Sequence, residues 1–193
     1  MRVNKARAGG QILLAAARRR RTIPGQPVYP MAESWRTRLL RWKMNLYPAY
    51  RRTGARVEHI AEDRLEARIR LPLNRATRNL HGTIFGGAMY AAVDPLHAVL
   101  LAANLGPDYL IWMKRAEVEF RRPGRGVLRA TARVTATELD EVRRALESAP
   151  KIERRYEITL VDEADQTVAA CVLWLHLRRR APAETPMEQV VFP

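Results

Sequence analysis

Alternating apolar and charged residues run through much of the chain and predict β-strands. Between Leu65 and Leu71 every second residue is apolar and the residues between them are Glu or Arg, which places one face against a core and the other in solvent. Strands are likewise expected at 57–60, 110–120, 128–134, 153–161 and 167–177. Because this alternation favours an antiparallel sheet with one covered face, the sequence predicts about five or six such strands.

The residues from Asn79 to Gly106 differ from the strands, since they are nearly all apolar around the full circumference of a helix. Glycines mark its entry, Gly106 supplies a stop, and Pro95 predicts a kink because proline cannot donate a backbone hydrogen bond. No other segment is apolar enough to cover the sheet. The sequence therefore predicts an α+β fold, in which one long central helix is wrapped by a curved antiparallel sheet.

Two further helices are expected outside this centre. Trp35, Leu39, Trp42 and Leu46 recur at spacings of four, three and four residues, so they share one face of a helix over 33–47. We expect this apolar stripe to pack on the edge of the domain; the alternatives are contact with an anionic membrane or with an acyl chain. A second, polar helix is expected at 138–148.

Length and charge divide the chain into three parts. A chain of 193 residues suits one domain, which we place at 31–180, followed by a flexible tail at 181–193. The first 30 residues hold seven Lys or Arg and no acid. They are interpreted as a disordered basic arm or a mis-annotated extension with true initiation at Met31; a targeting segment is the third alternative. The whole chain carries a formal net charge of +14.

Several functional classes lack their characteristic residues. The chain has two serines, neither in a nucleophile-elbow context, and its four histidines show no metal-ligand spacing. Phosphate-cradling and dinucleotide-binding glycine motifs are missing, so no metal and no cofactor are expected. No specific nucleic-acid motif and no transmembrane segment are expected, and the single cysteine, Cys171, favours a reducing, cytoplasmic location.

The entry of the central helix resembles a known family. The pattern Asn79-x-x-Gly82-x-x-Phe85-Gly86-Gly87, with Asp94 seven residues later, resembles hot-dog-fold acyl-CoA thioesterases of the phenylacetyl-CoA type. The wider stretch 39–179 is similar to a mainly bacterial, thioesterase-like branch of that superfamily. Phe85 stands where the thioesterase pattern has a His, and Ala98 where many members carry a Ser or Thr hydroxyl; these departures bear on activity more than on fold.

The resemblance implies carboxylate chemistry with backbone polarisation. The amides of Gly86 and Gly87 would bind the oxygen that becomes anionic when a thioester is attacked, and Asp94 would act as general base or nucleophile. The alternative is that Asp94 caps a second helix beginning at Pro95. Asn79 would orient the water or the thioester, or else would close the loop before the helix.

Spacing along the helix adds an oligomeric prediction. Gly86 and Asp94 are eight residues apart, about 12 Å along one helix, so one thioester cannot reach both. Two copies with antiparallel helices can place Asp94 of one beside Gly86 of the other, which predicts a homodimer, or a tetramer of such dimers. Gly87, Phe85, His81, Lys114 and Arg122 are expected to bind substrate. The expected partner is an acyl-CoA or acyl-carrier thioester. A non-catalytic acyl-binding protein is the second hypothesis, and a hydratase or dehydratase the third.

Overall fold

The computed structural model describes residues 33–181 of the chain. The predicted basic arm at 1–30, and all but the first residue of the predicted tail at 181–193, lie outside this part. The boundaries proposed for these segments stay predictions.

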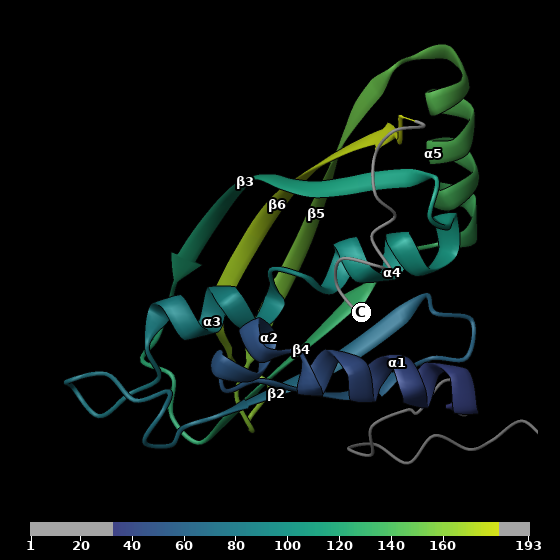
Figure 1. Ribbon diagram of the computed structural model, residues 1–193. Helices are drawn as coiled ribbons and strands as arrows, with labels where there is room; N and C mark the ends of the chain where they lie inside the picture. The colour runs from purple at the N-terminus through teal and green to yellow at the C-terminus, as the bar shows by residue number, and fades with distance from the viewer. Residues whose placement is uncertain (1–32, 182–193) are drawn as a thin grey trace, which may run out of the picture. The chain divides into compact units, whose positions relative to one another are not determined.

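Six strands form one antiparallel sheet in the order β1-β2-β4-β5-β6-β3 (Figure 1). The strands are β1 (Arg56–Ile60), β2 (Glu66–Pro72), β3 (Tyr109–Phe120), β4 (Val127–Arg133), β5 (Lys151–Val161) and β6 (Thr167–Arg179). The predicted sheet is confirmed, and each strand begins and ends within two residues of its predicted bounds. The connection from β2 to β3 carries the central helix, and the sheet curves around this helix.

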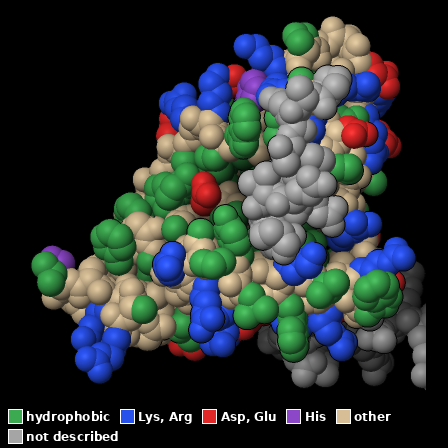
Figure 2. Space-filling view, in the orientation of Figure 1, with side chains coloured by type: hydrophobic (Ala, Val, Ile, Leu, Met, Phe, Trp, Pro, Cys, Tyr) green, Lys and Arg blue, Asp and Glu red, His purple; other side chains and the backbone are tan. Residues whose placement is uncertain are grey.

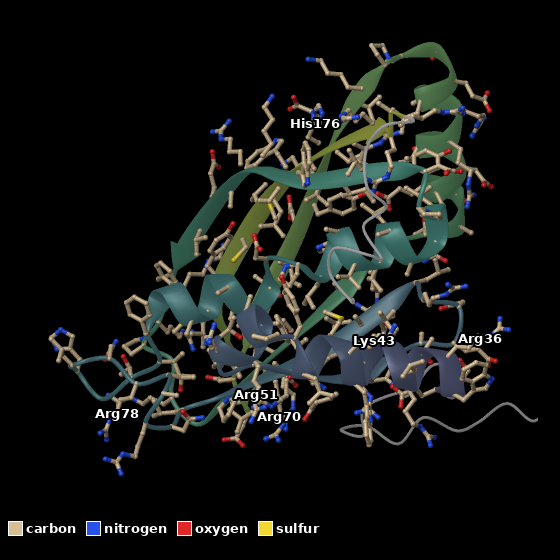
Figure 3. All side chains as sticks on the ribbon, viewed as in Figure 1. Arg36, Lys43, Arg51, Arg70, Arg78 and His176 are labelled. Atoms are coloured by element: carbon tan, nitrogen blue, oxygen red, sulfur yellow. The ribbon has the colours of Figure 1, made fainter. Side chains whose placement is uncertain are left out.

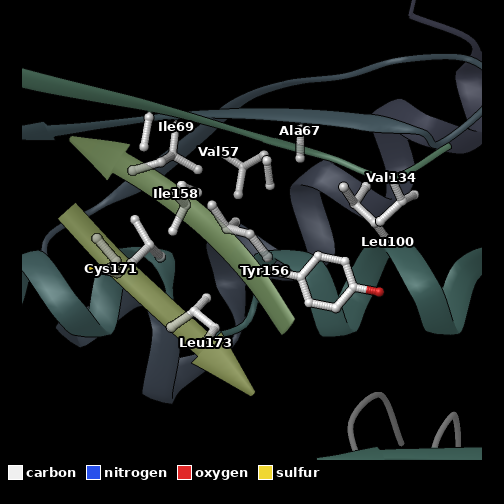
Figure 4. Packing of buried hydrophobic residues seen from close by; sticks show 14 of the residues in the cluster. Val57, Ala67, Ile69, Leu100, Val134, Tyr156, Ile158, Cys171 and Leu173 are labelled. Carbon is white, nitrogen blue, oxygen red and sulfur yellow. The ribbon is translucent and has the colours of Figure 1, made fainter. Parts of the chain in front are cut away.

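Alternation along the strands builds the core. On β6 the side chains of Leu173, Leu175 and Leu177 have no exposed surface, and each such burial contributes roughly 1.5–3 kcal/mol relative to an exposed side chain. Figure 4 shows Leu173 and its neighbours on the strands in one apolar layer with Leu100 of the central helix. The hydrophobic core therefore lies between the inner face of the sheet and that helix, as the hot-dog architecture requires.

The central helix runs from Gly86 to Leu105 and is divided at Asp94–Pro95 into α3 (Gly86–Val93) and α4 (Leu96–Leu105). This break confirms the predicted kink, because Pro95 has no N–H to donate to the preceding turn. By length and composition alone the stretch could cross a membrane. In the structure it is the core helix, and Val93, Leu96 and Leu100 are fully buried against the sheet.

Two short helices, α1 (Trp35–Leu46) and α2 (Pro48–Arg52), precede the sheet. Ser34 caps α1, and the Asn45 side chain pairs with the backbone N–H and C=O of Val57, both at 2.9 Å, which covers the outer edge of β1.

The predicted packing face of α1 was wrong. Its apolar stripe is exposed, by 70% at Trp35, 49% at Leu39, 59% at Trp42 and 62% at Leu46. The buried positions of the helix are Thr37 and Met44, and Leu40 is half-buried. Periodicity shows which residues share a face, but it does not show which of two faces meets the core. Thr37 and Met44 are seven residues apart and define a second, opposite face.

The polar helix predicted after β4 is confirmed as α5 (Ala136–Ser148). It begins with a capping box, in which the Thr135 hydroxyl accepts a hydrogen bond from the N–H of Glu138 and the Glu138 carboxylate accepts one from the N–H of Thr135. Leu139, Val142 and Leu146 are buried, so α5 closes the core where α4 meets β5.

Candidate functional site

The entry of the central helix presents unpaired amides. α3 begins at Gly86 with Phe85 as its N-cap in an extended conformation, and no side chain caps it. Within residues 33–181, the N–H groups of Gly86 and Gly87 donate no hydrogen bond to other parts of the chain. The first N–H groups of a helix have no intrahelical acceptor and carry the positive end of its dipole. They therefore form a site for an anionic or polarised oxygen.

Two aromatic rings explain why this entry is made of glycine. A Cβ at Gly86 would lie 2.9 Å from the ring of Phe120, and a Cβ at Gly87 would overlap the ring of Phe85. Both rings are more than half exposed. The predicted substrate-binding residue Phe85 thus lies directly beside the helix amides.

The loop before the helix is closed by Asn79. Its Oδ1 accepts hydrogen bonds from the N–H groups of His81 and Thr83, and its Nδ2 donates to the Thr83 hydroxyl at 2.9 Å. These bonds favour the loop-closing interpretation over the orientation of water. His81 and the neighbouring Leu80 are exposed at the tip of this loop, so the structure gives His81 no contact with the amides of Gly86 and Gly87.

Asp94 lies at the other end of α3. It is the C-cap residue, in helical conformation, and the first turn of α4 has no side-chain cap. Its Oδ1 accepts a hydrogen bond from the hydroxyl of Tyr90 at 2.8 Å. The capping alternative is therefore not observed, and the half-buried carboxylate is held by Tyr90 instead.

Tyr90 is a site residue that the sequence analysis missed. Burial and the hydrogen bond to Asp94 raise the pKa of Tyr90 to about 12, so the phenol stays protonated at neutral pH and remains a donor. The signal was present in the sequence, because residues four apart on a helix lie on the same face. A polar aromatic residue one turn before the lone carboxylate was the feature to examine.

A groove of about 880 Å³ runs along the face of α3 and α4 that is turned away from the sheet. Its other wall is formed by α1 and α2, and its end by the start of β3. Figure 2 shows hydrophobic side chains gathered over this part of the surface. Asp94 and Tyr90 line it among small or apolar residues, which include Ala98, Val99, Ala102, Leu40, Met44 and Ile111. The prediction of an entirely enclosed helix therefore holds only for the side facing the sheet.

The two basic residues that were predicted to bind substrate, Lys114 and Arg122, lie outside the central helix. Lys114 sits at the irregularity in β3 and pairs with Glu153 of β5, which lies on the outer face of the sheet. Arg122 follows β3 and donates to Gln166 at 2.9 Å. Within one chain Lys114 is on the opposite side of the sheet from Asp94. Arg122 belongs to the loop whose Gly124 carbonyl accepts a hydrogen bond from Ile84, next to the helix entry.

His97, three residues after Asp94, points into the core. It is 2% exposed and stacks on Tyr156 of β5 with ring centroids 4.5 Å apart. Burial lowers the pKa of His97 to about 4. This placement makes His97 a structural residue of the core. Within the described residues, no group of three or more His, Cys, Asp or Glu converges to hold a metal.

Comparison with solved structures places this arrangement among known proteins. The Pseudomonas aeruginosa protein PA5026, described as of unknown function and a "Probable Thioesterase", is 25% identical, with a TM-score of 0.66 over 74% of this chain and 95% of that one. The Haemophilus influenzae thioesterase HI1161 is 13% identical, with a TM-score of 0.60 over 79% and 97%. The Escherichia coli PaaI protein of the phenylacetic acid degradation operon is 18% identical, with a TM-score of 0.53 over 76% and 93%.

The sequence itself matches one family model. No curated protein sequence matches the chain. The model of the domain of unknown function DUF4442 matches residues 36–177, which include strands β1 to β5, most of β6 and both halves of the central helix. The chain therefore belongs to the DUF4442 family and has the fold of the thioesterase-like hot-dog proteins.

Proposed function

We propose that this protein hydrolyses a thioester of an acyl group, carried by coenzyme A or by an acyl-carrier protein, at a site shared by two copies of the chain. The observation that carries the proposal is the pairing of two features on one helix. Unpaired amides begin α3 at Gly86 and Gly87, and a carboxylate held by a hydroxyl ends it at Asp94. The thioesterase-like neighbours support the reaction class.

The two features must come from different copies. Gly86 and Asp94 stand at opposite ends of α3, about 12 Å apart along its axis. Strand β3 supports such an assembly: it pairs with β6 on one side only, within the described strands, and runs for 12 residues. A long unpaired edge is a template for another strand. In contrast, the edge of β1 is covered by α1 through Asn45. A two-fold axis at β3 would set the central helices antiparallel.

The chemistry follows from these positions. Asp94 accepts a proton from a water molecule as the water oxygen attacks the thioester carbonyl carbon. The carbonyl oxygen becomes anionic and is stabilised by the amides of Gly86 and Gly87 of the other copy. The carbon–sulfur bond then breaks, the proton passes from Asp94 to the leaving sulfur, and a carboxylic acid and a thiol are released. Tyr90 fixes the Asp94 carboxylate throughout by donating to Oδ1.

The groove beside Asp94 supports an apolar acyl group as the part of the substrate that is recognised. Its walls offer side chains such as Ala98, Val99 and Met44, and burial of hydrocarbon there is favourable by about 0.8 kcal/mol per methylene. Arg122, in the loop beside the helix entry, is a candidate for binding a phosphate of the carrier group. Lys114 would serve only if the partner copy brought it to the site.

The proposal is tested by acyl-CoA hydrolysis with the wild type and an Asp94→Asn variant. We expect kcat to fall by about 10²- to 10⁴-fold, because the general base is lost, while acyl-CoA still binds. Asp140→Asn is the matched control, since Asp140 lies on the surface of α5 and pairs only with Arg143. Unchanged hydrolysis in Asp94→Asn would contradict the assigned role, as would an active monomer in sedimentation.

Mixed dimers test whether the site is shared. Gly86→Pro removes one amide at the first helical position, where the helix backbone accepts proline. Its ring would displace the half-exposed Phe120 side chain, so thermal unfolding is used to check that the variant is folded. Both this variant and Asp94→Asn should be inactive alone. In a random mixture half of the dimers are hybrids, and each hybrid holds one site with both groups intact. We expect roughly a quarter of the wild-type rate to return. A mixture that stays inactive would place both groups in the same chain.

A non-catalytic acyl-binding protein is the second candidate function. Its support is Phe85, whose ring lies against Gly87 and which stands where the thioesterase pattern that the helix entry resembles has a His. Binding of acyl-CoA without turnover, in the wild type and in Asp94→Asn alike, would favour this candidate.

A further inference from the structure

Helix α1 leaves four large apolar side chains largely exposed within the described residues. Trp35, Leu39, Trp42 and Leu46 are each about half exposed or more. Tryptophan is the residue type most costly to leave in water without a partner, since it is large and apolar with a single polar group. A contiguous apolar patch of this kind marks an interaction surface.

The four side chains form a narrow stripe on the side of α1 away from the protein. At 100° per residue they fall within an arc of about 60°. The buried residues Thr37 and Met44 fall about 170° away from the centre of that arc by the same arithmetic. The stripe is thus directed outward along about 18 Å of helix, and Leu39 lies at its edge nearest the groove.

Basic residues flank the stripe on both sides. Arg38 lies beyond one edge, and Arg36 and Lys43 lie beyond the other. Figure 3 shows Arg36 at one end of the helix, Lys43 on the side that faces α4, and Arg51 on the adjoining α2. Between Glu33 and Glu58 the sequence has seven Lys or Arg and no acidic residue. Glu33 pairs with Arg41 at 2.7 Å, which leaves the balance of this surface strongly positive.

We propose that the outward face of α1 docks on an anionic phospholipid surface. An interfacial helix carries Trp and Leu on one side with Lys and Arg beside them, so that the apolar side chains enter the acyl boundary while the cations meet lipid phosphates. Each basic group near an anionic surface contributes about 1 kcal/mol, a factor of about five in partitioning. Figure 2 shows hydrophobic and basic side chains interleaved along this edge of the molecule.

Charge argues against two other occupants of this face, a second copy and residues 1–30. A second copy docking through α1 about a two-fold axis would bring the same basic residues against one another. Residues 1–30 carry seven Lys or Arg and no acid, so they too have the sign that this surface repels. An anionic lipid surface satisfies both the apolar stripe and its flanking charges.

The stripe also borders the groove. Leu39 of the stripe and the flanking residues Arg36 and Lys43 also line the groove. A lipid surface bound by α1 therefore lies beside the opening that contains Asp94. The docking itself is independent of the proposed hydrolysis, because it rests on residues that take no part in it.

Co-sedimentation of the full-length protein with vesicles tests the proposal. Vesicles of phosphatidylcholine alone are compared with vesicles that contain one third phosphatidylglycerol, at low and at physiological salt. We expect binding to the anionic vesicles, at least tenfold weaker in a Trp35→Ala/Trp42→Ala variant. Trp112→Ala is the matched control, since Trp112 is 53% exposed on β3 and lies off the stripe. Arg36→Glu/Arg38→Glu should also weaken binding and reduce its dependence on salt.

Three results would overturn the proposal. The first is equal binding of the wild type and the double Trp variant to anionic vesicles, which would assign the binding to other basic residues. The second is an equal loss in Trp112→Ala. The third is a change of oligomeric state in the double Trp variant during sedimentation without lipid, which would assign the stripe to a second copy. Thermal unfolding is used to check that each variant is folded. We expect each to be folded, because the substituted side chains are exposed.

Discussion

His97 makes the stability of this protein sensitive to mild acid. The imidazole is 2% exposed and is stacked on Tyr156, and its Nδ1 has no hydrogen-bond partner in the described part of the chain. Burial lowers the pKa of His97 from 6.5 to about 4, because the cation would have to leave water without a compensating charge. The folded protein therefore keeps this residue neutral at a pH where the unfolded chain protonates it.

The pKa difference gives the size of the effect. A drop from 6.5 to about 4 corresponds to about 3 kcal/mol of unfolding free energy in full. Above pH 6.5 the residue is neutral in both states and has no effect. As the pH falls below 6.5 the unfolded state takes up the proton first, so stability decreases, and it stops decreasing below about pH 4. At pH 5 the expected loss is about 2 kcal/mol, or roughly 4–8 °C in Tm for a domain of this size.

The assay is urea unfolding of the wild type and a His97→Phe variant, at equal protein concentration, at pH 7.5 and pH 5. Phenylalanine keeps a ring against Tyr156 but cannot be protonated. Carboxylates that titrate near pH 5 affect both proteins alike, so the difference between them isolates the histidine. We expect the wild type to lose about 2 kcal/mol more than the variant between the two pH values. Parallel losses in the two proteins would refute the reasoning.

Three other predictions follow from local geometry. Gly54→Ala should destabilise the protein by about 2–4 kcal/mol, because φ is +84° and the new Cβ would collide with the buried Thr77. Gly82→Ala is the control: φ is +75° and nothing lies within 4 Å of the new Cβ, so only the cost of the left-handed backbone, about 1–2 kcal/mol, is expected. Equal losses of Tm in the two variants would contradict the role of Thr77. Thr135→Ala should lower Tm by about 2–4 °C through loss of the α5 cap, and an unchanged Tm would show that the capping box contributes nothing. Tyr90→Phe should reduce the kcat for acyl-CoA by about tenfold, through loss of one hydrogen bond to Asp94, and a change confined to KM would assign Tyr90 to binding instead.

Period-two and helical patterns located the elements of the described chain except the short helix α2. The six strands, the central helix and its break at Pro95 were all expected from the sequence, because burial of one face of a strand imposes alternation and proline lacks an N–H. The glycines at 86 and 87 and the carboxylate at 94 were likewise visible as exceptions within an apolar segment. These features are local, since each depends on residues that are neighbours along the chain.

The role of individual polar residues was less visible. Asn79 fitted two interpretations, and only its hydrogen bonds to Thr83 and His81 favour one of them. Asn45 gave no signal at all, although it pairs with the open edge of β1. Tyr90 was not singled out, although it lies one helical turn before Asp94 and donates a hydrogen bond to it. Hydrogen bonds made by side chains depend on distances between groups, and sequence spacing fixes those distances only within one helix or strand.

By itself the sequence determined most of the elements, which residues share a face of each element, and which residues are capable of taking part in a reaction. The tertiary structure decided which face of each element met the core. It turned the stripe of α1 outward, buried His97 against Tyr156, and placed Asp94 in a groove that no local sequence pattern predicts. The physical reason is that periodicity records which side chains point the same way, whereas burial depends on what the rest of the chain places opposite them.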